Sequence, residues 1–167
     1  MKKLFSLMFL IITCLSCFNS PNDKKEINLL TEAYRSGHLT VVSSMLKEIQ
    51  ENRKFTNEEE VLYIKTLFYQ ANWKDFFSHW VSVQNKTPEL VLLYFKAVLL
   101  SKTPVAVSSE DESKLIELLS VSPEACLLYI KFTKNKNRLQ EKKLILAQGK
   151  QFQTHLDRLI KELGENK

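Results

Sequence analysis

The residue types that perform most protein chemistry are few and scattered in this sequence. The three histidines, His38, His79 and His155, lie far apart along the chain, and no cluster of histidine and cysteine has the spacing of a metal site. The sequence contains no glycine-rich phosphate loop, no G-x-S-x-G nucleophile turn and no H-E-x-x-H pair. It therefore predicts a non-catalytic protein that needs no metal or other cofactor.

The three cysteines divide between an apolar internal segment and the N-terminus. Cys126 lies in the run EACLLYIK, where apolar neighbours favour a buried, inert thiol over a nucleophile. Cys14 and Cys17 end a segment with two lysines and a mostly apolar run from Leu4 to Leu15. Such a segment is typical of an export signal and is too short to span a bilayer comfortably.

The end of this segment, Leu15-Ser16-Cys17, resembles a bacterial lipoprotein signal, with the relaxed pattern of spirochaetal lipoproteins. The resemblance implies a signal peptide over residues 1–16 and an acylated Cys17, followed by a polar tether through residue 25. It also implies a cell-envelope location, at the outer membrane or the periplasmic face of a bacterial membrane. Cys14 is the alternative site of acylation. The alternative without a lipid is an ordinary cleaved signal peptide or an uncleaved membrane anchor. With Cys14 removed and Cys17 acylated, Cys126 would have no partner for an intramolecular disulfide.

Composition favours a helical protein with no nucleic-acid partner. The chain is 44% hydrophobic and 26% charged, as a globular protein is, and its three glycines and four prolines are too few for a turn-rich β fold. The net charge is +5, and two of these charges, Lys2 and Lys3, belong to the signal. The remainder is too small and too dispersed for a nucleic-acid surface.

One short phrase occurs three times. PELVLLYFK, Pro88 to Lys96, returns as PEACLLYIK, Pro123 to Lys131, and a related form, NEEEVLYIK, runs from Asn57 to Lys65. Each phrase carries acidic residues in its first turn, where they meet unpaired backbone N–H groups. The repeated start and the repeated apolar centre predict that each phrase begins the first helix of a helical hairpin.

The residues before each phrase carry helix-start signals. Thr56 and Glu59 have the spacing of a capping box, whereas Thr87 and Ser122 each precede a proline that fits the first helical position. Other helices are expected between and beyond the phrases, to give eight in four pairs: Ile27 to Tyr34, ending at Gly37; Leu39 to Ile49; a helix from Trp73; a helix from Ser108 with a capping box at Ser109 and Glu112; and a final helix from about Arg138 to Leu163.

The phrase recurs at spacings of 31 and 35 residues, as expected for stacked helix-turn-helix units. Residues 24–135 resemble tetratricopeptide-type repeats: Pro88 and Pro123 match the repeat-ending proline, Tyr94 and Tyr129 the early aromatic residue, and Gly37 the turn within the repeat. The resemblance implies an all-α fold, a right-handed stack of helix pairs forming one domain over residues 26–167, with the final helix as its cap.

The chain departs from the tetratricopeptide pattern at three positions. Val42, Phe76 and Val98 stand where that family has small residues for close helix contact. Another stack of α–α hairpins is therefore the alternative architecture.

Two groups of residues are candidates for binding. Lys65, Lys96 and Lys131, one in each phrase, would form a row along the concave face of such a stack and could receive an acidic peptide or a glycan. A solvated helix face is the alternative. Trp73 and Trp80 belong to an aromatic group expected mainly between helices, but either would be an interface anchor if it were exposed.

These patterns together predict a membrane-anchored, non-catalytic lipoprotein that binds a protein or peptide partner through a helical-repeat groove. A structural or host-facing surface lipoprotein without a groove ligand is the alternative. A third possibility is an accessory subunit of an envelope assembly or transport machine.

The lipid anchor gives the first testable prediction. Cys17→Ala should abolish incorporation of labelled palmitate into the protein expressed in bacterial cells, because the acylated thiol is lost. The signal with Cys14→Ala should remain labelled. Labelling that survives Cys17→Ala but not Cys14→Ala would move the anchor to Cys14.

Overall fold

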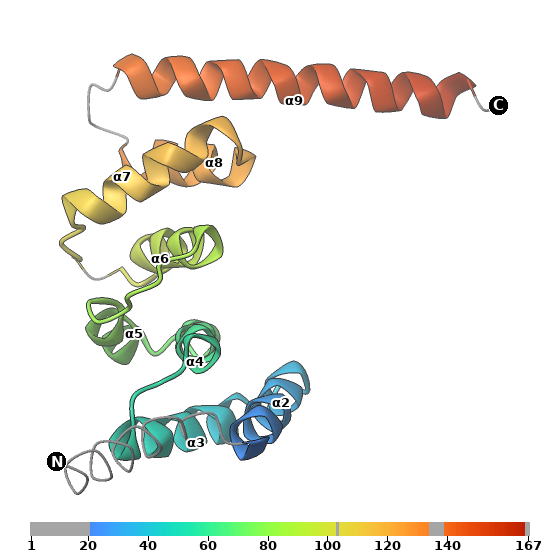
Figure 1. Ribbon diagram of the computed structural model, residues 1–167. Coiled ribbons are helices and arrows are strands. Elements are labelled where there is room, and N and C mark those ends of the chain that lie inside the picture. Colours follow the sequence, from blue (N-terminus) through green and yellow to red (C-terminus); the bar gives the residue numbers. More distant parts are fainter. Residues whose placement is uncertain (1–20, 103, 134–138, 166–167) are drawn as a thin grey trace, which may run out of the picture. The chain divides into compact units, whose positions relative to one another are not determined.

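The computed structural model describes residues 21–102, 104–133 and 139–165 (Figure 1). These residues contain eight α-helices, one 3₁₀ turn and no strand, so the predicted all-α class and helix number are confirmed. The elements are α2 (Pro21–Arg35), α3 (Leu39–Asn52), α4 (Asn57–Tyr69), α5 (Trp73–Trp80), α6 (Pro88–Leu100), α7 (Ser109–Glu117), η1 (Leu118–Ser120), α8 (Pro123–Phe132) and α9 (Leu139–Glu165).

The N-terminal predictions lie largely outside the described residues. The signal segment, Cys14 and the proposed anchor Cys17 belong to residues 1–20. α2 begins at Pro21, so the second half of the expected tether is helical. No helix in the part of the chain that the structure describes is both long and apolar enough to cross a membrane.

The predicted caps form where each phrase begins. The Thr56 N–H donates to the Glu59 carboxylate at 2.8 Å and the Glu59 N–H donates to the Thr56 hydroxyl at 3.3 Å, which completes a capping box at α4. The Thr87 hydroxyl caps α6 and the Ser122 hydroxyl caps α8, each followed by proline at the start of the helix. These start sites are therefore confirmed.

The predicted box at α7 is displaced by one residue. Ser108, with extended backbone angles of φ −69° and ψ 153°, is the cap, and its hydroxyl accepts the Asp111 N–H at 3.0 Å. Ser109 already lies within the helix. The prediction of Ser109 and Glu112 was wrong because both Ser-x-x-acid pairs fit the pattern and only the backbone angles select between them.

Two turns between helices share one hydrogen-bond pattern. The Gly37 N–H donates to Tyr34 O at 3.0 Å and the His38 N–H donates to Ala33 O at 2.9 Å, which ends α2 as predicted. Gly37 has a φ of +80°, a conformation that suits glycine. Ala71 occupies the equivalent place between α4 and α5 with a φ of 52°, so this turn carries backbone strain that the first does not.

The contacts between helices group the chain into two compact units, one ending at Thr66 and one beginning at Leu67. In the first unit, α2 packs on α3, and the buried side chains include Leu30, Val42, Leu46 and Ile64. In the second unit, α6 contacts α7 and α8, and the buried core includes Phe76, Phe95, Leu115, Leu119 and Tyr129. A single domain over residues 26–167 stays a prediction.

Helix α9 covers the rest of the second unit only at its beginning. It contacts η1 and α8, and Ile145 and Gln148 are half-buried there. Every residue from Gly149 to Glu162 is exposed. The expected cap is thus confined to the first part of α9, and Figure 1 shows the remainder extending past α8.

A buried ion pair joins the α3–α4 loop to the start of α4. Arg53 donates two hydrogen bonds to Glu59, at 2.7 and 2.6 Å, and the Glu59 side chain is only 1% exposed. Burial raises the pKa of Glu59, but the hydrogen bonds from Arg53 and Thr56 and the Arg53 charge more than offset it, and the net pKa lies below the ordinary 4.5.

The Glu59 pair gives a pH-dependent prediction. Glu59→Gln should lower the free energy of unfolding by about 2 kcal/mol at neutral pH, because the charged hydrogen bonds are lost. Since folding lowers this pKa, the contribution is complete above the ordinary value of 4.5 and is lost as the pH falls through the folded-state pKa. The difference between wild type and variant, measured by urea denaturation and circular dichroism, should therefore shrink in acid.

Glu58→Gln is the matched control, because Glu58 is an exposed carboxylate in the same turn. It should leave the free energy of unfolding nearly unchanged. A Glu59→Gln effect that stays constant as the pH falls would contradict the role assigned to the ion pair.

Candidate functional site

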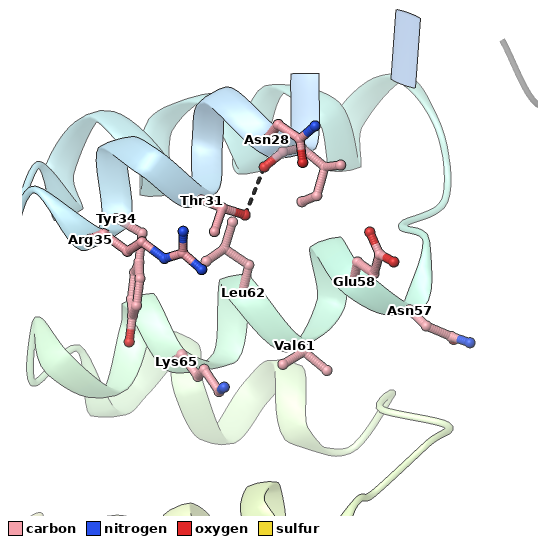
Figure 2. Close-up of a pocket in the computed structure, with 10 residues that line it drawn as sticks. Asn28, Thr31, Tyr34, Arg35, Asn57, Glu58, Val61, Leu62 and Lys65 are labelled. Carbon is pink, nitrogen blue, oxygen red and sulfur yellow. Dashed lines mark hydrogen bonds between the residues drawn. The ribbon is translucent and has the colours of Figure 1, made fainter. Parts of the chain in front are cut away.

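An open groove of about 480 Å³ lies between α2 and α4 in the first unit (Figure 2). Both helices supply residues at helical spacing, so one face of each helix lines the groove. The lining residues are Ile27, Asn28, Thr31, Tyr34 and Arg35 from α2, and Asn57, Glu58, Val61, Leu62 and Lys65 from α4. α2 and α4 are the first helices of two successive predicted hairpins.

The two ends of the groove differ in charge. Figure 2 shows Tyr34, Arg35 and Lys65 at one end and Asn57 and Glu58 at the other. The Arg35 side chain is exposed, and its guanidinium extends into the groove in the same view. A ligand that lies along the groove would therefore meet positive charge at one end and a carboxylate at the other.

The centre of the groove is mainly apolar. Three aliphatic side chains line the groove, Ile27 from α2 and Val61 and Leu62 from α4. The Thr31 hydroxyl, which also lies there, donates to the Ile27 carbonyl at 2.7 Å, so that its proton is already engaged within α2. The centre suits an apolar side chain, whereas the basic end suits a carboxylate.

The lining of the groove consists of aliphatic, hydroxyl, amide and charged side chains. Among the described residues that line it there is no histidine and no cysteine. Across the described residues, no group of three or more histidine, cysteine or acidic side chains is placed to hold a metal ion. The lining thus offers apolar contacts, hydrogen-bonding groups and charges of both signs.

The three lysines of the repeated phrase have different surroundings. Lys65 lines the groove, whereas Lys96 on α6 forms an ion pair of 2.7 Å with Glu124 on α8. Lys131 is exposed in the last turn of α8. Lys65 belongs to the first unit and the other two to the second, so a continuous row of lysines stays a prediction.

The two tryptophans are mostly packed against other rings. Trp80 is 3% exposed and stacks on Tyr94 with ring centroids 4.5 Å apart. Trp73 is half-buried and makes edge contacts with Phe68 and Phe76. The condition for an interface anchor, an exposed indole, is therefore not met at Trp80.

A buried polar cluster explains the position of Trp80. The Lys86 ammonium lies 5.0 Å from the Trp80 ring centroid and 2.8 Å from the Asp111 carboxylate, which also accepts the Ser108 hydroxyl proton at 2.7 Å. Lys86 and Asp111 are 25 residues apart, and sequence inspection missed the pair. The one available signal was the Ser108-x-x-Asp111 spacing, which identifies a helix start but not the distant lysine.

This cluster shifts two pKa values. Burial by itself would raise the pKa of Asp111. Hydrogen bonds from Lys86 and Ser108, an interaction with the Trp80 indole and the Lys86 charge more than offset burial, so the net pKa of Asp111 lies below its usual value. The Trp80 N–H itself lies outside ordinary hydrogen-bond geometry. Burial, assisted by the Asp111 charge, raises the pKa of Tyr94 to about 12.

The histidines and Cys126 are not assembled into a reactive site. His38 is exposed in the first unit, whereas His79 is half-buried on α5 and burial lowers its pKa. His155 is exposed on α9, with Nδ1 3.1 Å from Arg158. Cys126 is buried as predicted; its thiol donates to Leu119 O at 3.2 Å and burial raises its pKa, which disfavours the thiolate.

Comparisons of the chain with protein-family models, with curated proteins and with solved structures find no match. The α2–α4 groove and the exposed surfaces are therefore the observations on which function rests.

The contrast between buried and exposed ion pairs gives a stability prediction. Asp111→Asn should lower the free energy of unfolding by about 3 kcal/mol, because it leaves Lys86 buried without its partner charge. Lys96→Gln should cost less than about 1 kcal/mol, because that pair is solvated. Urea denaturation followed by tryptophan fluorescence reports on both, since Trp73 and Trp80 lie in the same unit.

Glu110→Gln serves as the control, because Glu110 is an exposed acid in the first turn of α7 that pairs with Lys114 one turn further along the same helix. If Asp111→Asn were no more destabilising than Glu110→Gln, the buried cluster would not hold the second unit together.

Proposed function

We propose that this chain is a lipid-anchored, non-catalytic interaction module of a bacterial cell envelope, and that the α2–α4 groove binds a segment of a partner protein. The observation that carries the proposal is the combination of an apolar centre, formed by Ile27, Val61 and Leu62, with basic side chains at one end. That combination fits a peptide segment whose acidic residue or terminal carboxylate follows an apolar side chain.

The direction of the bound segment follows from the charges. Its carboxylate would lie beside Arg35 and Lys65, where two cations can share it, and the apolar side chain would lie against Val61. The opposite end, with Glu58, would repel a second acidic residue. The groove would therefore prefer a segment acidic at one end only.

The repeat resemblance supports a groove at this place. In a right-handed tetratricopeptide-like stack, the first helices of successive hairpins line the concave surface, and α2 and α4 are first helices of the predicted hairpins. Of the predicted lysine row, Lys65 lines the groove beside Arg35, and Lys96 forms an ion pair with Glu124. The proposal accordingly rests on Arg35 together with Lys65.

The proposed lipid anchor would keep this groove close to a membrane. α2 begins at Pro21, four residues after Cys17 in the sequence, and four residues of chain span at most about 14 Å. A groove so near the acyl chains would meet proteins of the same membrane, or segments that approach its surface. The expected partner is thus another envelope protein.

The test places a photoreactive amino acid at Asn28, an exposed groove residue, in the full-length chain expressed in bacterial cells. We expect one dominant crosslinked partner that is lost in the double variant Arg35→Glu, Lys65→Glu, because reversed charges repel the acidic segment. Lys47→Glu, an exposed reversal on α3 outside the groove, should leave the crosslink intact.

Two results would count against the proposal. A crosslink that persists in the double variant would mean that the groove charges do not recognise the partner. The absence of any crosslink in the wild-type chain would favour a structural or host-facing surface lipoprotein without a groove ligand.

A further inference from the structure

The exposed part of α9 carries an apolar stripe that the described residues leave open to solvent. Phe152, Leu156 and Leu159 follow one another at four and three residues, the spacing of one face of a coiled-coil helix. They are 49%, 41% and 40% exposed. Ile145, one heptad before Phe152, lies on the same face and is half-buried where α9 contacts the rest of the second unit. The same face of α9 is therefore packed within the second unit at its beginning and exposed to solvent further along the helix.

The charges of α9 favour a protein occupant over a lipid surface. The helix has nearly balanced charge, with five basic residues, Lys142, Lys143, Lys150, Arg158 and Lys161, and four acidic residues, Glu141, Asp157, Glu162 and Glu165. A helix that lies on anionic lipid is expected to be rich in lysine and arginine on its polar face, without this compensation. Heptad spacing is instead the pattern of a helix that packs along another helix.

We propose that the exposed part of α9, from Gly149 to its end, pairs in antiparallel orientation with the same segment of a second copy of this chain. A parallel pair is disfavoured by the second unit itself. α8 and η1 already lie against the first part of the stripe, in the space that a parallel partner helix would have to enter. An antiparallel partner that overlaps only from Gly149 onward avoids this space.

One register satisfies both the apolar and the charged residues. Leu156 lies opposite Leu159 of the second copy, and by symmetry Leu159 lies opposite Leu156. The same alignment sets His155 beside Glu162 of the second copy, and the two-fold axis repeats this pair, so that two imidazole–carboxylate pairs lie along one edge of the seam. Antiparallel helix dipoles add to the attraction.

The overlap is short, and the interface belongs to the class that buries less than about 1,200 Å² in total. Association of this size is reversible, and copies attached to one membrane would reach a high effective concentration. The paired segments project from the second unit, whereas the α2–α4 groove belongs to the first unit. Self-association is therefore independent of the groove ligand.

Cysteine crosslinking tests the register in full-length chains expressed in bacterial cells with two different tags. A copy with Leu156→Cys and a copy with Leu159→Cys should form a mixed disulfide under mild oxidation, more strongly than either variant with itself. Stronger self-crosslinking of both variants would indicate a parallel pair and would overturn the proposal. Absence of all crosslinks above the wild-type background would overturn it as well.

Co-capture of the two tagged copies tests the interface without cysteines. Leu156→Asp should abolish co-capture, because the aspartate would be buried against Leu159 of the second copy. Thr154→Asp adds the same charge on the opposite face of α9 and should leave co-capture unchanged. Both residues are exposed, so the circular dichroism melting curves should match that of the wild type. Unchanged co-capture by Leu156→Asp would show that this face does not join the copies.

Discussion

The placement of a buried carboxylate at the start of a helix is the constraint on which both units depend. In the first unit, Glu59 is the third residue of α4, and it caps the helix while Arg53 neutralises it. In the second unit, Asp111 is the third residue of α7, and its carboxylate accepts hydrogen bonds from Lys86 and from the hydroxyl of the capping residue Ser108. A buried charge is costly unless it is paired and hydrogen-bonded. Each carboxylate therefore fixes both the helix start and the loop that supplies its cation.

These two sites determine which surfaces remain available. Glu59 sets the first turn of α4, and the helical period then places Val61 and Lys65 along the α2–α4 groove. In the second unit, the ammonium of the Lys86–Asp111 pair lies over the ring of Trp80, which is buried. The same structural solution thus precedes the groove-lining residues of α4 in one unit and lies beside a buried indole in the other.

The repeated phrase serves packing before it serves binding. Its first-turn acid and its lysine meet between copies of the phrase, as Lys96 and Glu124 show for α6 and α8. Repetition of a charge in a sequence therefore does not imply a row of charges open to ligands. The exposed side chains include Arg35 at the α2–α4 groove and the apolar stripe of α9. The two surfaces lie in different units.

The sequence by itself determined the features whose causes lie within a few residues. The eight helices, the caps at Thr56, Thr87 and Ser122 and the turn at Gly37 depend on backbone hydrogen bonds between near neighbours, and each has a recognisable residue pattern. The choice of Ser108 over Ser109 was beyond this local information, because both residues satisfy the same spacing.

Only the tertiary structure decided which side chains meet across longer separations. No local pattern connects the residues of the two ion pairs, Lys86–Asp111 and Lys96–Glu124. No local pattern shows the burial of Trp80 either. The groove likewise needs α2 and α4 to face each other, although its residues stand at ordinary helical spacing in each helix. The helical period shows which residues share one face of a helix. Which residues that face contacts depends on the packing of segments distant in sequence, because the same packing determines both burial and charge pairing.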